Sequence, residues 1–227
     1  MPSTPRRCQH DGVADLSQMR RDYTAARLLE ADLAPTWVEQ FDRWFAAAVA
    51  AELPEPNAVV VATADTDGAP DARIVLMKGY DEYGIVFGTS YASAKGAQLA
   101  VNPRAALVFP WHPMQRQVRV AGRVERIGPT ASDGLWDPRP RGAQLAAVAS
   151  VQSTVVDSGE ELADRVRTLD EQTPPGPVPR PEVWGGYRVI PERVEFWQGG
   201  ADRLHDRLRF VRDDEEGGGW IVQRLAP

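Results

Sequence analysis

The sequence predicts an α+β protein, mainly antiparallel β, in which a sheet closes into a barrel flanked by helices. Many short runs rich in β-branched and aromatic residues are joined by turn signals. Long helical patterns do not alternate with these runs, as they would in a doubly wound parallel sheet. The chain has 227 residues, of which 43% are hydrophobic, so one large domain can bury a core without help from disulfides or metal ions.

The N-terminal part of the chain contains a polar tail and then one amphipathic helix. Residues 1–18 show no hydrophobic periodicity, and we expect them to be disordered, with a single domain over residues 19–227. We expect a helix from Pro35 to about Glu52, which ends before two further prolines. Its apolar residues recur at spacings of three and four and form one stripe, made of Trp37, Phe41, Trp44, Phe45 and Ala48.

Strands dominate the middle of the chain. Residues 57–64 and 71–78 flank Asp65–Pro70, whose Asp-Gly pair is typical of a hairpin turn. A short helix is expected at residues 93–101. Further strands are expected at residues 84–89, 105–109 and 117–127. The last of these alternates apolar and polar residues, so one face is expected to be buried.

The C-terminal part begins with helices and ends with strands. Helices are expected at residues 141–150 and 158–171, and the second opens with Ser158-x-x-Glu161, a capping-box pattern. Residues 173–181 contain five prolines, which predicts an extended connector. The strands are expected at residues 184–190, 193–198, 207–212 and 220–225.

Composition and missing motifs argue against several classes of function. The net charge of −6 disfavours a general binder of nucleic acid or membranes, although the basic strand Gln117–Arg126 leaves a nucleic-acid-binding barrel as a third hypothesis. Cys8 is the single cysteine, and His10, His112 and His205 lack ligand spacing, so we expect no metal site. The longest apolar run has eight residues and no secretory signal is present, so we expect a cytoplasmic protein.

Motifs for dinucleotide binding, phosphate-binding loops and serine hydrolases are also missing from the sequence. Cationic residues instead occur near the ends of predicted strands, several of them beside aromatic residues. They are Arg73, Lys78, Lys95, Arg139, Arg203 and Arg207, with His205 between the last two. Any one of them alone is commonly a solvated residue at a sheet edge. Together they predict a cleft that binds a phosphorylated ligand, because arginine and lysine are the usual phosphate binders.

Several strings of residues occur in an order that resembles the pyridoxamine 5′-phosphate oxidase family. They are Arg73–Lys78, Asp81–Phe87, Arg116–Val120, Trp184–Val189, Glu195–Gly199, Arg203–Arg207 and Arg224–Pro227. The resemblance extends from about Met19 to Pro227. It implies a split β-barrel and a homodimer with two FMN molecules in clefts at the subunit interface. It also implies oxidation of pyridoxamine or pyridoxine 5′-phosphate to pyridoxal 5′-phosphate, with O2 reoxidising the flavin to give H2O2.

The resemblance assigns roles to particular residues. It implies FMN contacts at Arg73, Ile74, Val75, Leu76, Lys78, Thr89, Lys95, Gln117, Gln152, Ser153, Trp197 and Arg207. It implies substrate contacts at Lys78, Arg139, Arg203 and His205, of which Arg203 and His205 are the catalytic candidates. Arg20 and Tyr23 match a segment that can fold over the bound substrate. Arg73, Lys95 and Ser153 have the chemistry to neutralise and hydrogen-bond a phosphate dianion.

The chain also departs from the family pattern. The family often has Tyr where Leu135 stands and Ser where Ala143 stands, and both give hydroxyl groups to the substrate phosphate. Many members have Arg in place of Ala94 and Tyr in place of Gly88. Arg141 is a candidate to replace the lost phosphate contacts. These departures keep open a rival hypothesis, a paralogous flavin oxidase of a secondary-metabolite precursor such as a dihydrophenazine.

Overall fold

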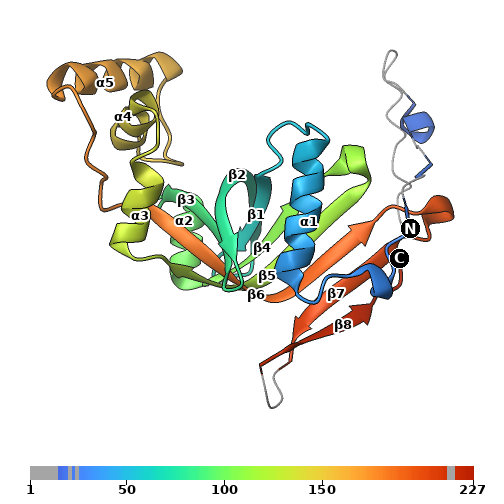
Figure 1. Ribbon diagram of the computed structural model, residues 1–227. Helices are drawn as coiled ribbons and strands as arrows, with labels where there is room; N and C mark the ends of the chain where they lie inside the picture. The colour runs from blue at the N-terminus through green and yellow to red at the C-terminus, as the bar shows by residue number, and fades with distance from the viewer. Residues whose placement is uncertain (1–14, 20–21, 24–25, 214–217) are drawn as a thin grey trace, which may run out of the picture.

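A closed antiparallel β-barrel forms the centre of the computed structural model, which describes residues 15–19, 22–23, 26–213 and 218–227 (Figure 1). Neighbouring strands follow the order β3-β2-β1-β4-β5-β6, and pairing of β3 with β6 closes the barrel. β7 and β8 then extend the sheet beyond β6. The strands are β1 (Ala58–Ala64), β2 (Pro70–Asp81), β3 (Gly84–Ser90), β4 (Arg104–Phe109), β5 (Arg116–Arg126), β6 (Trp184–Gln198), β7 (Asp206–Arg212) and β8 (Trp220–Arg224). The predicted barrel is confirmed.

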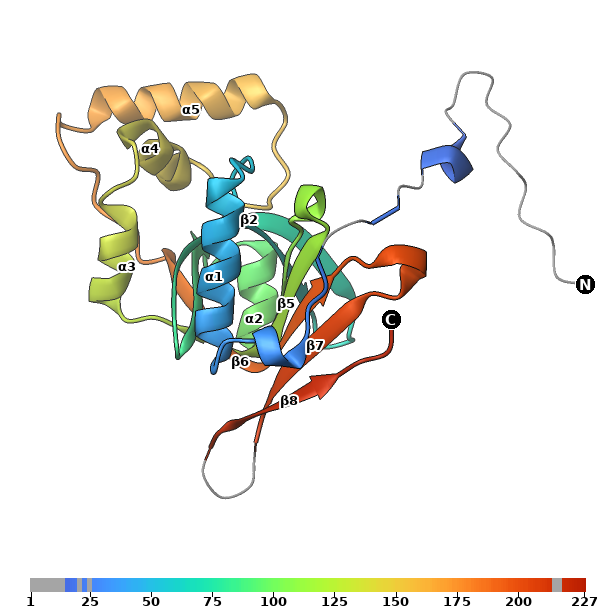
Figure 2. The same cartoon turned by 45° about the vertical axis from the view of Figure 1, so that its right-hand side comes forward.

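Helices lie around the barrel. They are α1 (Trp37–Ala50), α2 (Ala94–Val101), α3 (Pro129–Trp136), α4 (Arg141–Ala149) and α5 (Gly159–Gln172). α3, α4 and α5 gather on one side of the barrel in both views, whereas β7 and β8 extend from the other side (Figure 1, Figure 2). Within the described part of the chain, none of the helices is both long and apolar enough to cross a bilayer.

Helix α1 covers the barrel core with the apolar stripe that the sequence predicts. Phe41 packs against Phe109 and Trp44 against Phe196, with ring centroids 5.0 and 5.3 Å apart. The helix begins two residues later than expected, because Thr36 caps it. The Thr36 hydroxyl accepts from the Glu39 amide, and the Glu39 carboxylate accepts from the Thr36 amide.

A second, smaller core joins α3 and α4 to the proline-rich connector. Trp136, Leu145, Val178 and Trp184 are buried together, and the Trp136 indole donates to the Val178 carbonyl at 2.7 Å. The sequence pattern does not predict α3. This helix is short and its apolar residues do not form a long stripe, although Pro129 at its first turn is a start signal.

β6 is one strand of 15 residues, not the two strands that were expected. Pro191 interrupted the sequence pattern, but the pairing with β5 shifts register between Ala121 and Gly122 and accommodates the proline. Gly122 is required at this point, because a Cβ atom there would lie 1.9 Å from the Ile190 carbonyl oxygen.

This close approach gives a test of the fold. Gly122→Ala should lower the free energy of unfolding by about 2–3 kcal/mol, because β5 and β6 must separate locally. Gly134→Ala is the matched control, since its Cβ would meet nothing within 4 Å in the interior of α3. That substitution should raise stability by up to about 1 kcal/mol. Urea unfolding of both variants checks the pair, and equal stability of the two would contradict the β5–β6 contact.

Candidate active site

Most of the predicted site residues line two cavities. The first, which we call the β2 cavity, has a volume of about 780 Å³, within the usual range for ligand sites. It lies among β2, β3, α2 and α4. The predicted residues that line it are Arg73, Ile74, Val75, Leu76, Lys78, Thr89, Lys95, Arg139, Gln152 and Ser153.

Lys95 gives one end of the β2 cavity a buried positive charge. The residue is only 5% exposed, and its ammonium donates to the hydroxyls of Thr89 and Ser93 at 3.3 and 3.4 Å. Among the described residues, no carboxylate forms an ion pair with Lys95. Burial, and next the charge of Arg73, lower the pKa of Lys95. An anion bound here would supply the missing counter-charge.

Arg73 lies beside Lys95 and is held firmly on one side. Its guanidinium donates to the Thr63 hydroxyl at 2.6 Å and pairs with Asp71. β1 and α2 supply further acceptors, the Val61 carbonyl and the Gln98 side chain, both at 3.3 Å. The fixed guanidinium and the buried ammonium therefore make a rigid cationic wall.

Arg139 supplies a second cationic position in the same cavity. Its guanidinium lies 5.5 Å from the Trp136 ring and 5.0 Å from the Trp184 ring, and it donates to the Ala143 carbonyl at 3.0 Å. Its Nε atom is buried and has no hydrogen-bond partner. Burial lowers the pKa of Arg139. A buried donor without an acceptor is unfavourable, so this position also favours an anionic ligand.

The second cavity, of about 670 Å³, lies around Trp197 and is called the Trp197 cavity below. Tyr23, Trp197, Arg203 and His205 line it together with Gln115. The Tyr23 ring lies 5.9 Å from the Trp197 ring and 5.6 Å from His205, so residues far apart in sequence meet here. Arg20, the other residue predicted in this segment, lies outside the described residues.

The loop that carries Arg203 and His205 has an unusual backbone. Asp202 and Arg203 adopt left-handed φ angles of 52° and 63°. Each costs a residue other than glycine about 1–2 kcal/mol, and such strain is concentrated at functional sites.

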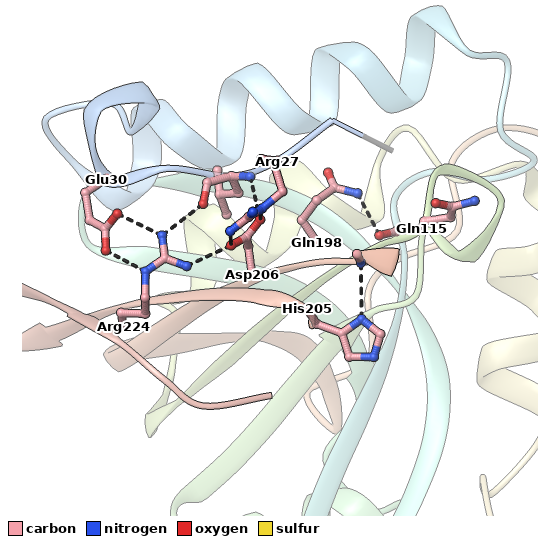
Figure 3. A network of polar contacts seen from close by, with 9 residues as sticks. Arg27, Glu30, Gln115, Gln198, His205, Asp206 and Arg224 are labelled. Carbon is pink, nitrogen blue, oxygen red and sulfur yellow. Dashed lines mark hydrogen bonds and ion pairs between the residues drawn. The ribbon is translucent and has the colours of Figure 1, made fainter. Parts of the chain in front are cut away.

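The protonation state of His205 follows from its hydrogen bond. The Gly200 amide donates to His205 Nδ1 at 3.2 Å (Figure 3), which leaves the ring proton on Nε2. Burial, and next the charges of Arg203 and Arg207, lower the pKa of His205. The neutral ring can therefore donate from Nε2 into the cavity.

Gln117 and Arg207 line neither cavity, but they flank Trp197 on the sheet. Gln117 pairs with Trp197 across β5 and β6, and Trp197 pairs with Arg207 across β6 and β7. Arg207 donates to the buried carboxylate of Glu195 at 2.8 Å and to the Ala226 carbonyl at 2.8 Å. The predicted flavin residues thus form two groups, and among the described residues no side chain lines both cavities.

Three of the positions that depart from the family pattern, Gly88, Ala94 and Ala143, line the β2 cavity. Ala143 lines the β2 cavity with a methyl group, and Leu135 packs in the smaller core. The expectation that Arg141 replaces the lost contacts is wrong. Its guanidinium donates to Asp170 at 2.8 and 3.0 Å and to carbonyls of the proline-rich connector. These hydrogen bonds join α4 to α5.

Sequence reasoning missed several residues that support the site. Trp136 holds Arg139, Glu195 holds Arg207, and Asp206 anchors the strained loop. A charged residue on the inward side of an alternating strand is the signal that could have found Asp206, whereas Glu195 alternates with core residues and gives no such signal. Among the described residues, no cluster of three or more His, Cys, Asp or Glu side chains is arranged to hold a metal ion.

Comparison with solved structures supports the same architecture. The chain is 30% identical to PhzG from Burkholderia lata 383, solved in complex with tetrahydrophenazine-1-carboxylic acid. The TM-score is 0.82, with 89% of this chain and 99% of that chain covered. A pyridoxamine 5′-phosphate oxidase-related, FMN-binding protein from Nostoc punctiforme has the same fold, with a TM-score of 0.67 at 20% identity over 86% of this chain and 99% of that one.

Comparison with known sequences gives the family. The family model described as pyridoxamine 5′-phosphate oxidase matches residues 45–172, and the model of the pyridoxine 5′-phosphate oxidase C-terminal dimerisation region matches residues 184–227. Proteins called pyridoxine/pyridoxamine 5′-phosphate oxidase are 53% identical in Salinispora arenicola (93% of this chain, 96% of that protein) and 51% identical in Synechocystis (96% and 100%). The chain therefore belongs to the pyridoxamine 5′-phosphate oxidase family of flavoprotein oxidoreductases.

Proposed function

We propose that this protein oxidises pyridoxine or pyridoxamine 5′-phosphate to pyridoxal 5′-phosphate in the cytoplasm, with FMN as cofactor and O2 as the electron acceptor. One observation carries the proposal: four cationic side chains, Arg73, Lys78, Lys95 and Arg139, line the β2 cavity. Two phosphate groups, one of the flavin and one of the substrate, would satisfy them. The relatives at about half identity carry the name of this activity.

FMN fits the residues better than a dinucleotide flavin does. Arg73, Lys95 and Ser153 would terminate on one phosphate, and the sequence has no fingerprint for binding an adenylate. Gln152 accepts from Thr89 at 3.1 Å and would face the ribityl chain, with Gln117 at the polar edge of the ring. When bound, FMN supplies a two-electron acceptor for the 4′ carbon of the substrate.

The chain itself would bind and orient the substrate. Lys78 and Arg139 would hold the substrate phosphate at one end. Arg203 and the Nε2–H of the neutral His205 would hold the ring so that its 4′ carbon points toward the flavin. The contribution of the protein is then placement and electrostatics, without nucleophilic attack by a side chain.

The two cavities favour a homodimer with composite sites. Trp184 lines the β2 cavity and Trp197 lines the other cavity, and both lie on β6. Trp197 follows Trp184 by thirteen positions, which is roughly 40 Å measured along the strand at about 3.3 Å per residue. Among the described residues, no side chain lines both cavities, so we place the two groups of flavin residues on different subunits of one site. A twofold dimer would bring the Trp197 cavity of one subunit to the β2 cavity of the other and create two equivalent sites.

A second candidate function is oxidation of a dihydrophenazine-like precursor. The 30% identical PhzG was solved with a tetrahydrophenazine carboxylic acid. Ala143 presents a methyl group to the β2 cavity, where the family often has a hydroxyl. If the FMN-loaded protein turns over neither B6 phosphate, this second function replaces the first.

The cofactor assignment predicts the behaviour of Lys95→Met. Denatured parent protein should release FMN, whereas the variant should bind FMN about ten- to a hundredfold more weakly, since a hydrogen bond to a charged group is worth about 1.5–3 kcal/mol. Because the pKa of Lys95 is lowered, affinity in the parent should also fall as alkaline pH removes its charge. Fluorescence titration measures both effects. Arg104→Gln, which removes an exposed ion pair of β4, is the control and should bind FMN as the parent does. Release of FAD by the denatured parent protein would contradict the assignment.

The composite site predicts complementation between two strongly impaired variants, assayed with FMN kept limiting. Lys95→Met damages only the β2 cavity, and Arg203→Ala damages only the Trp197 cavity. After subunit exchange, half of the dimers are mixed and each mixed dimer has one intact site, so about a quarter of the parent activity should return. Oxygen uptake measures the recovery. A mixture that stays inactive while mass spectrometry detects mixed dimers would exclude the shared site.

The substrate pose predicts different kinetics for two arginine variants. Arg139→Ala should raise KM about ten- to a hundredfold with little change in kcat, because a phosphate clamp binds ground and transition states alike. Arg203→Ala should lower kcat, because this residue orients the carbon that reacts. FMN content should stay normal in both. Steady-state oxidation of pyridoxine 5′-phosphate tests the pair, and an unchanged kcat for Arg203→Ala would mean that the pose is wrong.

A further inference from the structure

A buried carboxylate follows His205, which lines the Trp197 cavity, at the first residue of β7. The Asp206 side chain is 2% exposed. Successive strand residues point to opposite faces, so Asp206 points inward with Leu208 and Phe210. His205 and Arg207, its two chain neighbours, belong to the opposite face. Asp206 therefore holds the chain segment that carries His205 and Arg207, although Asp206 itself does not line the cavity.

Two arginines and a backbone amide surround this carboxylate (Figure 3). Arg27 donates to it through Nε at 2.6 Å and Nη2 at 2.9 Å, the Leu28 amide donates at 3.0 Å, and Arg224 donates at 2.8 Å. Arg224 also holds the Glu30 carboxylate with two hydrogen bonds, of 2.6 and 2.8 Å. One side chain thus connects residues 27–30, the start of β7 and the end of β8.

The cluster stays ionised at physiological pH. Hydrogen bonds from Arg27 hold the pKa of Asp206 well below its usual range, and Arg224 lowers the pKa of Glu30 to about 2. A carboxylate with a depressed pKa stabilises the folded state at neutral pH, and this contribution is lost only as the pH falls below about 4. The cluster is therefore a permanent structural connection and does not act as a pH switch.

The other stem of the same loop has a similar anchor. Gln198 pairs with Asp206 across β6 and β7 and is also buried. Its side chain donates to the Gln115 carbonyl at 3.0 Å and accepts from Arg116 at 2.9 Å. Residues 199–205 therefore lie between two buried polar anchors, which hold the loop while Asp202 and Arg203 keep their strained backbone.

We propose that Asp206 is a positioning residue, which acts through Arg203 and His205 and which Arg27 and Arg224 hold in place. The ion cluster fixes the stem of the loop, so that the Gly200–His205 hydrogen bond and the orientation of Arg203 exist before substrate binds. Through Arg27, the cluster also fixes the chain four residues after Tyr23, whose ring contacts His205. The kinetic part of this inference rests on the proposed function.

The kinetic test separates positioning from stability. Asp206→Asn keeps the shape of the side chain and removes its charge. At a temperature where the variant is folded and loaded with FMN, kcat should fall at least about tenfold, because small misplacements of orienting groups are costly. KM should change little, since Arg139 is untouched. Arg224→Lys should keep more activity than Arg224→Gln, because lysine retains the charge. Arg104→Gln, on an exposed ion pair, is the control and should behave as the parent.

A second readout needs no substrate. The side-chain nitrogen signals of His205 in 15N-labelled protein report its tautomer, and a His205→Gln spectrum assigns them. In Asp206→Asn these signals should lose the single-tautomer pattern, while the control keeps it. An unchanged kcat, or unchanged His205 signals, in folded Asp206→Asn would overturn the proposal. If the parent turns over neither B6 phosphate, the proposed function fails, and the His205 signals still decide whether Asp206 positions the loop.

Discussion

The pairing of β6 with β3, β5 and β7 is the constraint on which the rest of the structure depends. β6 closes the barrel through β3 and continues past it to carry β7. Its first residue, Trp184, supports Arg139 in the β2 cavity, and Trp197, near its end, forms the other cavity. The two cavities share no lining residue within the described part of the chain, and the dimer that we propose would bring together the residues that share one flavin. In that proposal, the chemistry requires the assembly of two subunits.

Local patterns predicted most of the fold, because alternation and helical periodicity report which face is buried. They succeeded for α1 and for the hairpin of β1 and β2, where pattern and burial agree. They failed where tertiary context decides: α3 is a short helix that packs through Trp136, and Pro191 is tolerated inside β6 because Gly122 permits a register shift. Local sequence patterns predict neither the orientation of Arg141 nor the separation of the two cavities.

Buried charges in this protein are of two kinds. Asp206 and Glu195 are fully paired with arginines, and such pairs fix geometry without offering much affinity for a ligand. The Lys95 side chain and the Nε atom of half-buried Arg139 are buried with incomplete partners, which is unfavourable in the protein alone. The sequence shows that all four residues are charged, but it does not show which of them are paired with other side chains. Only the structure shows which charges hold neighbouring side chains in place and which lack a partner and therefore favour binding of an anion.

The environment of Arg139 determines which anionic groups this part of the β2 cavity can bind. The guanidinium lies near the rings of Trp136 and Trp184, and one donor is committed to the Ala143 carbonyl, so its direction is fixed. With a methyl group at Ala143, recognition depends on charge and on the planar fork of the arginine. That fork matches a carboxylate as well as a phosphate. The same site could therefore serve either acid, and the ring-binding side, with Arg203 and His205, must then determine which compound is oxidised.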